Sequence, residues 1–209
     1  MSNLTALIAL AAADLKDAAH DTWSTAELTA HLRQTLRELD LAAPVPTAAT
    51  LTLASGSRAL DLSTLGELVE LWDVWHPYDA AAPAQPPVRP AWRWLSAEAI
   101  WLELEAPPAS AQAVRLLYGA PHAVDGLDGA TATTLDRYGE DLLVLGATAS
   151  AAEQLALART GAVNVAGFTP EQLARWAQER RRRYERGLAQ LAARRGRPAD
   201  PRLCWDEAV

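Results

Sequence analysis

The chain has 209 residues, half of them hydrophobic and 22% charged. This composition supports a sizeable core, excludes global disorder, and suits one compact domain or two small ones. The formal net charge is −7 at pH 7, and Lys16 is the only lysine among nineteen lysines and arginines. The single cysteine, Cys204, excludes an intramolecular disulfide and a cysteine-based zinc finger.

The apolar run at residues 4–13 is not preceded by a basic residue, so we do not expect a signal peptide. No stretch reaches the roughly 18 consecutive apolar residues of a membrane span, and we expect no membrane partner. The sequence therefore predicts a soluble protein made in a bacterial cytoplasm.

Two helices are expected at the start of the chain. Residues 4–19 carry apolar residues at helical spacing. In the following DTWSTAEL, Ser24 and Glu27 fit the capping box that begins a helix. A leucine stripe continues this second helix until Pro44 stops it.

From residue 47 the apolar period changes to two, which predicts an inserted antiparallel β-domain, a sandwich or a barrel. Residues 49–53 and 59–63 flank SGS and are expected to form a hairpin. The other predicted strands lie at 68–76, 92–95, 99–105 and 113–118.

The helical period returns over residues 136–158, where Gly146, Ala149 and Ala152 share a face that another helix can approach closely. A last helix is predicted from Thr169, with Gln172 closing a second capping box, to about residue 195, and Phe168 is expected to staple its start. The predicted fold class is α+β, a helical bundle from the N- and C-terminal helices with an inserted antiparallel β-domain. The predicted boundaries are 1–46 and 122–195 for the two helix pairs, 47–121 for the β insertion, and 196–209 for a C-terminal arm.

Motifs of catalysis are missing from the sequence. It contains no phosphate loop, nucleophile elbow or dinucleotide fingerprint, and its four histidines lie on different predicted elements. DGLDG at 125–129 lacks the acidic spacing of a calcium loop and favours a plain turn. His31 is expected to be a surface histidine rather than a general base. We therefore expect no enzyme, no catalytic residues, no cofactor and no metal.

Five tryptophans fall within the predicted β insertion. Packing in the core and on the sheet faces is the favoured interpretation, and an aromatic interface with another protein is the alternative, because tryptophan is enriched in interface anchors. A carbohydrate-stacking surface, with Glu103 or Glu105 acting on cell-wall sugars, is a weaker alternative. The candidate interface aromatics are Trp72, Trp75, Trp92, Trp94 and Trp101.

The segment QERRRRYERG, residues 178–187, places five arginines in ten positions of an acidic chain. At about 100° per residue these arginines cannot share one partner. Arg180 falls inside the apolar stripe of the last helix, where a guanidinium without a carboxylate is strongly destabilising. We therefore expect an acidic partner for Arg180, with Glu140 and Asp141 as the first candidates.

Arg175, Arg182 and Arg186 fall on the opposite ridge of the same helix, where they are free to meet solvent, a neighbouring subunit or DNA. Residues 170–197 carry nine arginines against three glutamates, a local charge of +6 that leaves −13 for the rest of the chain. This asymmetry favours self-association through unlike surfaces at least as much as nucleic-acid binding.

Four segments in this order resemble the head-to-tail adaptor proteins of tailed bacteriophages, also called connector or head-completion proteins. Together they cover roughly half of the chain, and none of them is distinctive alone. The segments are DTWSTAELTAHLRQTLRELDLAAP (21–44), SGSRALDLSTLGELVELWDVWHP (55–77), EDLLVLGATASAAEQLALA (140–158) and FTPEQLARWAQERRRRYERGLAQLAA (168–193).

The resemblance implies a virion ring, usually of twelve subunits, between the portal protein and a tail or stopper protein of the neck. Genomic DNA would pass through its channel without sequence-specific binding. The C-terminal arm would reach the portal or a neighbour, with Leu203 and Trp205 as apolar anchors. The elaborate β insertion leaves a stopper or tail-completion protein as the alternative, and a DNA-binding module using the arginine-rich helix as a weaker one.

Overall fold

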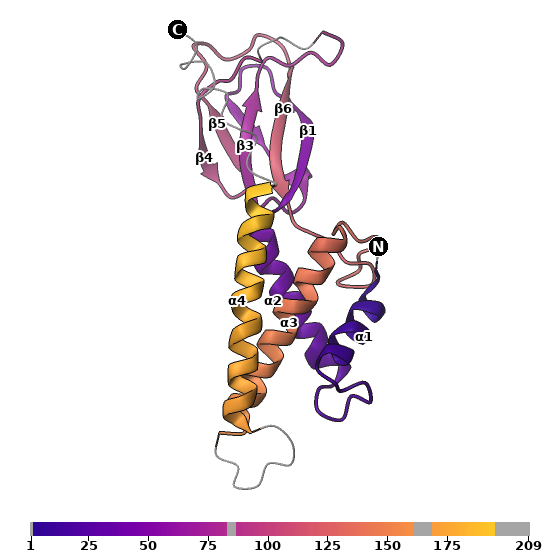
Figure 1. Ribbon diagram of the computed structural model, residues 1–209. Coiled ribbons are helices and arrows are strands. Elements are labelled where there is room, and N and C mark those ends of the chain that lie inside the picture. Colours follow the sequence, from indigo (N-terminus) through magenta and orange to yellow (C-terminus); the bar gives the residue numbers. More distant parts are fainter. Residues whose placement is uncertain (1, 83–86, 161–168, 195–209) are drawn as a thin grey trace. The chain divides into compact units, whose positions relative to one another are not determined.

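The structure is a computed structural model that describes residues 2–82, 87–160 and 169–194. Within these ranges it contains four α-helices, one short 3-10 helix and six strands, so the predicted α+β fold class is confirmed (Figure 1). The described chain divides into two compact units, one formed by residues up to Ala43 and from His122, the other by Pro44–Pro121. We describe each unit by itself.

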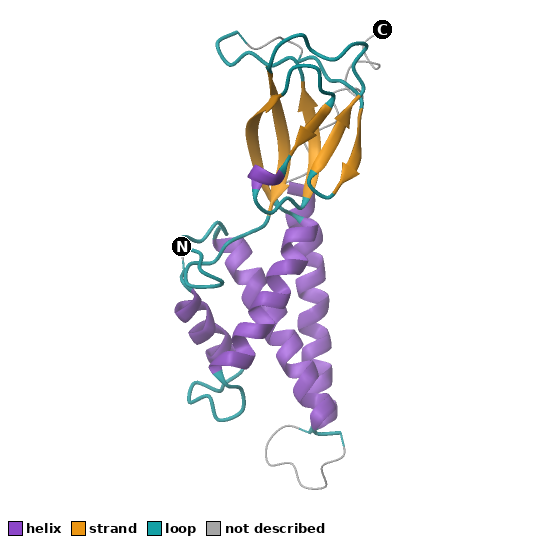
Figure 2. Ribbon diagram, turned by 180° about the vertical axis from the view of Figure 1, so that it is seen from behind, coloured by secondary structure: helices purple, strands orange, loops and turns teal. Residues whose placement is uncertain are grey.

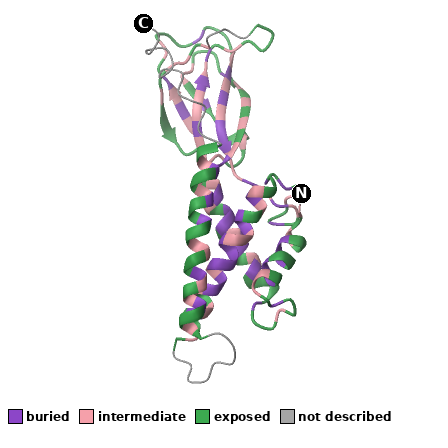
Figure 3. Ribbon diagram, viewed as in Figure 1, coloured by how far each residue is buried: buried purple, intermediate pink, exposed green. Residues whose placement is uncertain are grey.

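The helical unit consists of α1 (Leu4–Asp14), α2 (Thr25–Ala42), α3 (Arg137–Ala158) and α4 (Pro170–Arg194). Helix α3 contacts each of the other three helices. The buried positions lie on the faces that the helices turn toward one another (Figure 3). The largest fully buried side chains of this unit are Leu7, Leu28, Leu32, Leu39, Leu135, Leu143 and Tyr184.

Both predicted capping boxes are confirmed. The Ser24 hydroxyl accepts the Glu27 amide at 3.2 Å, and the Glu27 carboxylate accepts the Ser24 amide at 2.8 Å. At the start of α4, the Thr169 hydroxyl accepts the amide of Gln172, whose side chain in turn accepts the Thr169 amide. Phe168, the predicted staple, lies outside the described residues.

Helix α1 ends at Asp14, five residues before the predicted end at residue 19. The buried Asp17 carboxylate accepts the backbone amides of Asp21, Thr22 and Trp23, which draws the chain into a loop. Lys16 in this loop has a left-handed φ of 56°. A buried aspartate that collects backbone amides competes with helical hydrogen bonds, and helical spacing of apolar residues does not reveal it.

The small-residue face of α3 is confirmed as a site of close helix approach. A Cβ atom added to Gly146 would lie 2.5 Å from Thr35 Cγ2 of α2 and 2.9 Å from the Tyr184 ring of α4. Ala149 and Ala152 are fully buried. The absence of a side chain at residue 146 therefore lets α3 pack against two helices at once.

Helix α3 is also the one described helix that is long and apolar enough to cross a membrane by length and composition. Half of its most apolar window is buried inside the protein, and Leu143 and Ala147 belong to the helical core. The same length and composition are typical of the central helix of a bundle.

The β unit is a sandwich of two three-stranded antiparallel sheets (Figure 2). One sheet has the order β1-β6-β3 and the other β2-β5-β4. Their facing sides share one core that includes Leu60, Val74, Ile100 and Leu116. The strands are β1 (Val45–Leu53), β2 (Ala59–Asp61), β3 (Glu70–Trp75), β4 (Trp92–Ser96), β5 (Ala99–Leu102) and β6 (Gln112–Ala120).

The predicted hairpin between the first two strands is wrong. Strand β1 pairs along its whole length with β6, whereas β2 pairs with β5 in the other sheet. The chain crosses between the sheets, because this path buries both Leu53 and Leu60 in the shared core. The connecting turn is closed by the Ser57 amide, which donates to the Ala54 carbonyl at 3.1 Å, and it bonds to another loop through the Gly56 amide, which donates to the Pro108 carbonyl at 2.8 Å.

Candidate functional site: the two faces of helix α4

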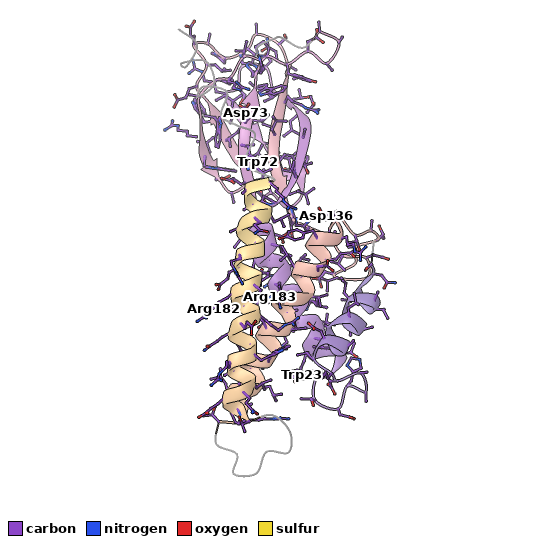
Figure 4. The ribbon with its side chains drawn as sticks, in the orientation of Figure 1. Trp23, Trp72, Asp73, Asp136, Arg182 and Arg183 are labelled. Carbon is purple, nitrogen blue, oxygen red and sulfur yellow. The ribbon has the colours of Figure 1, made fainter. Side chains whose placement is uncertain are left out.

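Helix α4 presents one buried face and one exposed face over its whole length. The buried residues follow helical spacing and pack in the core of the helical unit. They are Leu173, Ala177, Tyr184, Gly187 and Leu191. Within the central arginine run, Arg180 and Arg181 are partly buried, whereas Arg182 and Arg183, which Figure 4 labels, are exposed.

Arg180 lies at the edge of the inner face and is held by three groups. Its guanidinium forms an ion pair with Asp14 of α1 and donates to the Thr148 hydroxyl of α3 at 3.2 Å. It also lies over the Trp176 ring, with the guanidinium carbon 4.6 Å from the ring centre. The Thr148 hydroxyl donates in turn to Asp14, so a polar network joins three helices.

The predicted partners of Arg180, Glu140 and Asp141, are wrong. The Glu140 carboxylate accepts the Ser2 amide at 2.6 Å and the Ser2 hydroxyl at 2.8 Å, and Asp141 is exposed. The expectation that Arg180 needs a carboxylate is confirmed. A helical projection of α4 reveals that need but cannot place the end of α1 beside it, because that position depends on tertiary packing.

The pKa of Arg180 is lowered by burial and by the nearby charge of Arg183. A guanidinium nevertheless stays protonated in proteins. Arg180 therefore needs the Asp14 carboxylate as a counter-charge, since only 16% of its side chain and 31% of that of Asp14 are exposed.

Sequence reasoning missed a second cluster on the inner face. Arg181 forms an ion pair with Glu38 of α2 at 3.2 Å and another with Glu185 at 3.6 Å. The Tyr184 ring lies beneath Arg181, 5.4 Å from its guanidinium carbon, and burial together with Glu38 raises the pKa of Tyr184. No spacing rule links Glu38 to Arg181, because they are 143 residues apart.

The outer face carries Arg175, Arg182 and Arg186, and all three are exposed as predicted. We call these three residues the arginine ridge. Within the described residues, no carboxylate forms an ion pair with any of them. The one hydrogen bond that joins two of them runs from Arg186 Nε to the Arg182 carbonyl at 3.3 Å. The ridge is therefore a set of positive charges without counter-charges in this part of the chain.

Two hollows lie beside α1, α3 and α4; Asp14 borders both, and its partner Arg180 borders the second. One has a volume of about 550 Å³ and is lined by apolar side chains that include Trp23, Leu173 and Trp176. The other has a volume of about 530 Å³ and includes Arg183 and the half-exposed Leu10.

The five candidate tryptophans do not form one surface in the β unit. Trp75 lies on the outer side of its sheet and donates to Asp73 at 2.7 Å, the carboxylate that also binds Arg89 (Figure 4 labels Asp73). Trp72 donates to Glu70. The remaining three belong to the other sheet.

Trp92 packs on the core and meets Trp94 edge-on, with ring centres 5.9 Å apart. Trp101 points outward, because its neighbours Ile100 and Leu102 in the alternating strand are buried. Trp94 is 45% exposed and lies next to the exposed Leu95, so it is the tryptophan that best fits an interface.

His31 is buried, with its Nδ1 atom 3.1 Å from the Ser150 hydroxyl, so the expected surface position is wrong. Residues 125–129 form a turn, and its Asp128 binds Arg33 at 2.7 Å. In the described parts of the chain, no group of three histidine, cysteine or acidic side chains could hold a metal ion. The predicted arm anchors Leu203 and Trp205 lie outside the described residues.

Comparison with known proteins identifies no relative: no family model matches the chain, and no curated protein matches it.

Proposed function

We propose that this chain is a structural virion protein that forms a ring adaptor between the portal and the tail, extending the channel through which DNA passes. The similarity of four ordered segments to head-to-tail adaptors supports this proposal. A helical bundle with an inserted β-sandwich supplies rigid surfaces for a permanent assembly, and catalytic motifs are missing from the sequence.

The arginine ridge is the observation that carries the proposal. Three exposed arginines without an ion-pair partner in the described residues, on a chain of net charge −7, are available to an acidic surface outside their own bundle. A head-to-tail ring supplies one, because each copy presents one surface to a different surface of the next copy. Twelve copies is the number that the resemblance implies.

The β unit offers the complementary charge to a neighbouring copy. Residues 44–121 contain eight carboxylates and four arginines, a net charge of −4. Opposite charges on unlike surfaces favour closure of a ring and fix its register. The exposed carboxylates of the β unit are Asp61, Glu67, Asp79, Glu98, Glu103 and Glu105.

Native mass determination, alone and with the portal protein of the same virus, tests the proposal. We expect a closed ring of uniform mass, or a ring that forms when the portal is added. A protein that stays monomeric at all concentrations and does not bind the portal would contradict it. Binding only to a preformed portal–adaptor complex would instead identify a stopper.

Non-specific DNA binding is the second candidate, because the arginine ridge also fits phosphates. Three phosphate contacts predict a slope of about −3 for log affinity against log salt on duplex DNA. The acidic remainder of the chain opposes this candidate. Failure to shift DNA even at low salt would exclude it.

A further inference from the structure

The hollow lined by Trp23 and Trp176 is a preformed apolar pocket at one end of the helical unit. Leu155 of α3 and Leu173 of α4 complete its apolar lining, and the loop after α1 forms one wall. That wall is held in shape because Asp17 binds three backbone amides of the loop. The pocket has a volume of about 550 Å³, which is large enough for one or two bulky side chains.

The pocket border carries two cations whose charge is not taken up by its carboxylates. Asp14 pairs with Arg180, and Asp17 accepts backbone amides. Lys16 and Arg159 also line the pocket, and no carboxylate within the described residues pairs with either. An aromatic or aliphatic group followed by carboxylates is the ligand that this combination would bind.

The end of this chain has that chemistry. Residues 203–207 read LCWDE, with Leu203 and Trp205 followed by Asp206 and Glu207. This segment lies beyond Arg194, outside the described residues. Its two apolar side chains match the pocket lining, and its two carboxylates match Lys16 and Arg159.

Chain length favours a pocket on another copy. Trp176 lies about 27 Å along α4 from Arg194, at 1.5 Å per helical residue. Eleven residues from Arg194 to Trp205 span at most about 40 Å when fully extended. A return to the same copy's pocket would therefore require the arm to run back, largely extended, along most of α4, whereas a neighbour in a ring can offer its pocket at a shorter distance.

We propose that the pocket lined by Trp23, Leu173 and Trp176 receives the C-terminal segment 203–207 of a neighbouring copy. Trp205 fills the apolar lining, and Asp206 and Glu207 pair with Lys16 and Arg159. This inference rests on the proposed ring, and it assigns the arm a site on the next subunit rather than on the portal.

The only cysteine of the chain lies inside this segment, which makes the test direct. A photo-crosslinker attached to Cys204 of the full-length protein is activated in a mixture of ¹⁴N- and ¹⁵N-labelled copies. We expect crosslinked peptides that join isotopically different copies and contain residues of the pocket. The control carries the crosslinker at residue 63, in a Ser63→Cys, Cys204→Ser variant, and should not label the pocket. Crosslinks confined to one copy, or crosslinks from Cys204 to residues outside the pocket, would overturn the proposal.

Charge reversal provides a second, independent test. Lys16→Glu with Arg159→Glu, or Asp206→Lys with Glu207→Lys, should each weaken assembly about tenfold, and the four changes together should restore it. Trp205→Ala removes the side chain that fills the apolar lining and should weaken assembly by roughly thirtyfold. A ring unaffected by all these changes would contradict the proposed arm site and leave the ring function standing. A monomer in every sample would contradict the ring function itself.

Discussion

The inner and outer faces of α4 contain the same kind of residue in opposite situations. On the inner face, Arg180 pairs with a carboxylate of α1 and Arg181 with a carboxylate of α2. Both arginines are partly buried, and each guanidinium lies over an aromatic ring. On the outer face, Arg182 and Arg186 are exposed and have no acidic partner in the described chain. A single run of four arginines therefore contains residues that hold the bundle together and residues that are free for a partner outside it.

The local density of charge in a sequence is therefore a poor guide to function. Neighbouring residues in a helix point about 100° apart, so each arginine has its own environment. The inner arginines should affect stability, and the outer ones should affect assembly.

The largest expected effect is steric and lies on the inner face. Gly146→Val would place side-chain atoms against Thr35 and Tyr184, where even a Cβ atom is too close. We expect a loss of about 3 kcal/mol in the free energy of unfolding, measured by urea denaturation. Gln178→Ala, at an exposed position of α4, is the control and should change little. Unchanged stability of the valine variant would show that α2, α3 and α4 do not pack as described.

Removal of the inner charge should have the next largest effect. Arg180→Met keeps much of the side-chain volume but leaves Asp14 without its counter-charge, so we expect a loss of about 2 kcal/mol. Asp14→Asn should destabilise to a similar degree. In the double variant the losses should not add, because both changes break one interaction, and a coupling of about 1 kcal/mol is expected. Additive losses in urea denaturation would mean that the two side chains do not interact.

A pH dependence should arise from His31. Burial lowers the pKa of His31 in the folded protein. As the pH falls below about 6.5, the ordinary pKa of histidine, His31 is therefore protonated in the unfolded chain before it is protonated in the folded one. Stability from this residue is present above that value and is lost as the pH falls toward the folded pKa. His31→Gln should make the decline of stability between pH 7 and 5 shallower, by about 1 kcal/mol or less. An unchanged slope would contradict the burial of a neutral imidazole.

The smallest effect on stability should come from the arginine ridge. Each of Arg175→Ala, Arg182→Ala and Arg186→Ala should change the free energy of unfolding by less than about 0.5 kcal/mol, because exposed side chains without partners contribute little. Thermal and urea denaturation of the three variants, beside Arg180→Met, measure this directly. A loss as large as that of Arg180→Met at any ridge position would remove the distinction between the faces.

Much of the fold could be predicted from periodicity and capping. Ser24 and Thr169 begin helices as their capping boxes indicate, and the change from helical to alternating spacing locates the strands. Sheet partners could not be predicted, because β1 pairs with a strand about 65 residues away. A turn between two strands looks the same whether the chain stays in one sheet or crosses to the other.

The site was predicted in part. Helical geometry identified the inward position of Arg180 and the exposed ridge, since both depend on α4 alone. The partner Asp14, the Glu38–Arg181 pair and the burial of His31 depend on how separate helices pack, which local spacing does not encode. Asp14 in particular becomes available because α1 ends there.

We expect the inner face of α4 to hold the fold and the outer face to hold the proposed assembly. Native mass determination of the Arg175→Ala, Arg182→Ala, Arg186→Ala triple variant beside the unaltered protein tests this division most directly. The triple variant should keep its helical content and its unfolding midpoint but should no longer form a ring, alone or with the portal. A variant that retains the ring mass of the unaltered protein would contradict it.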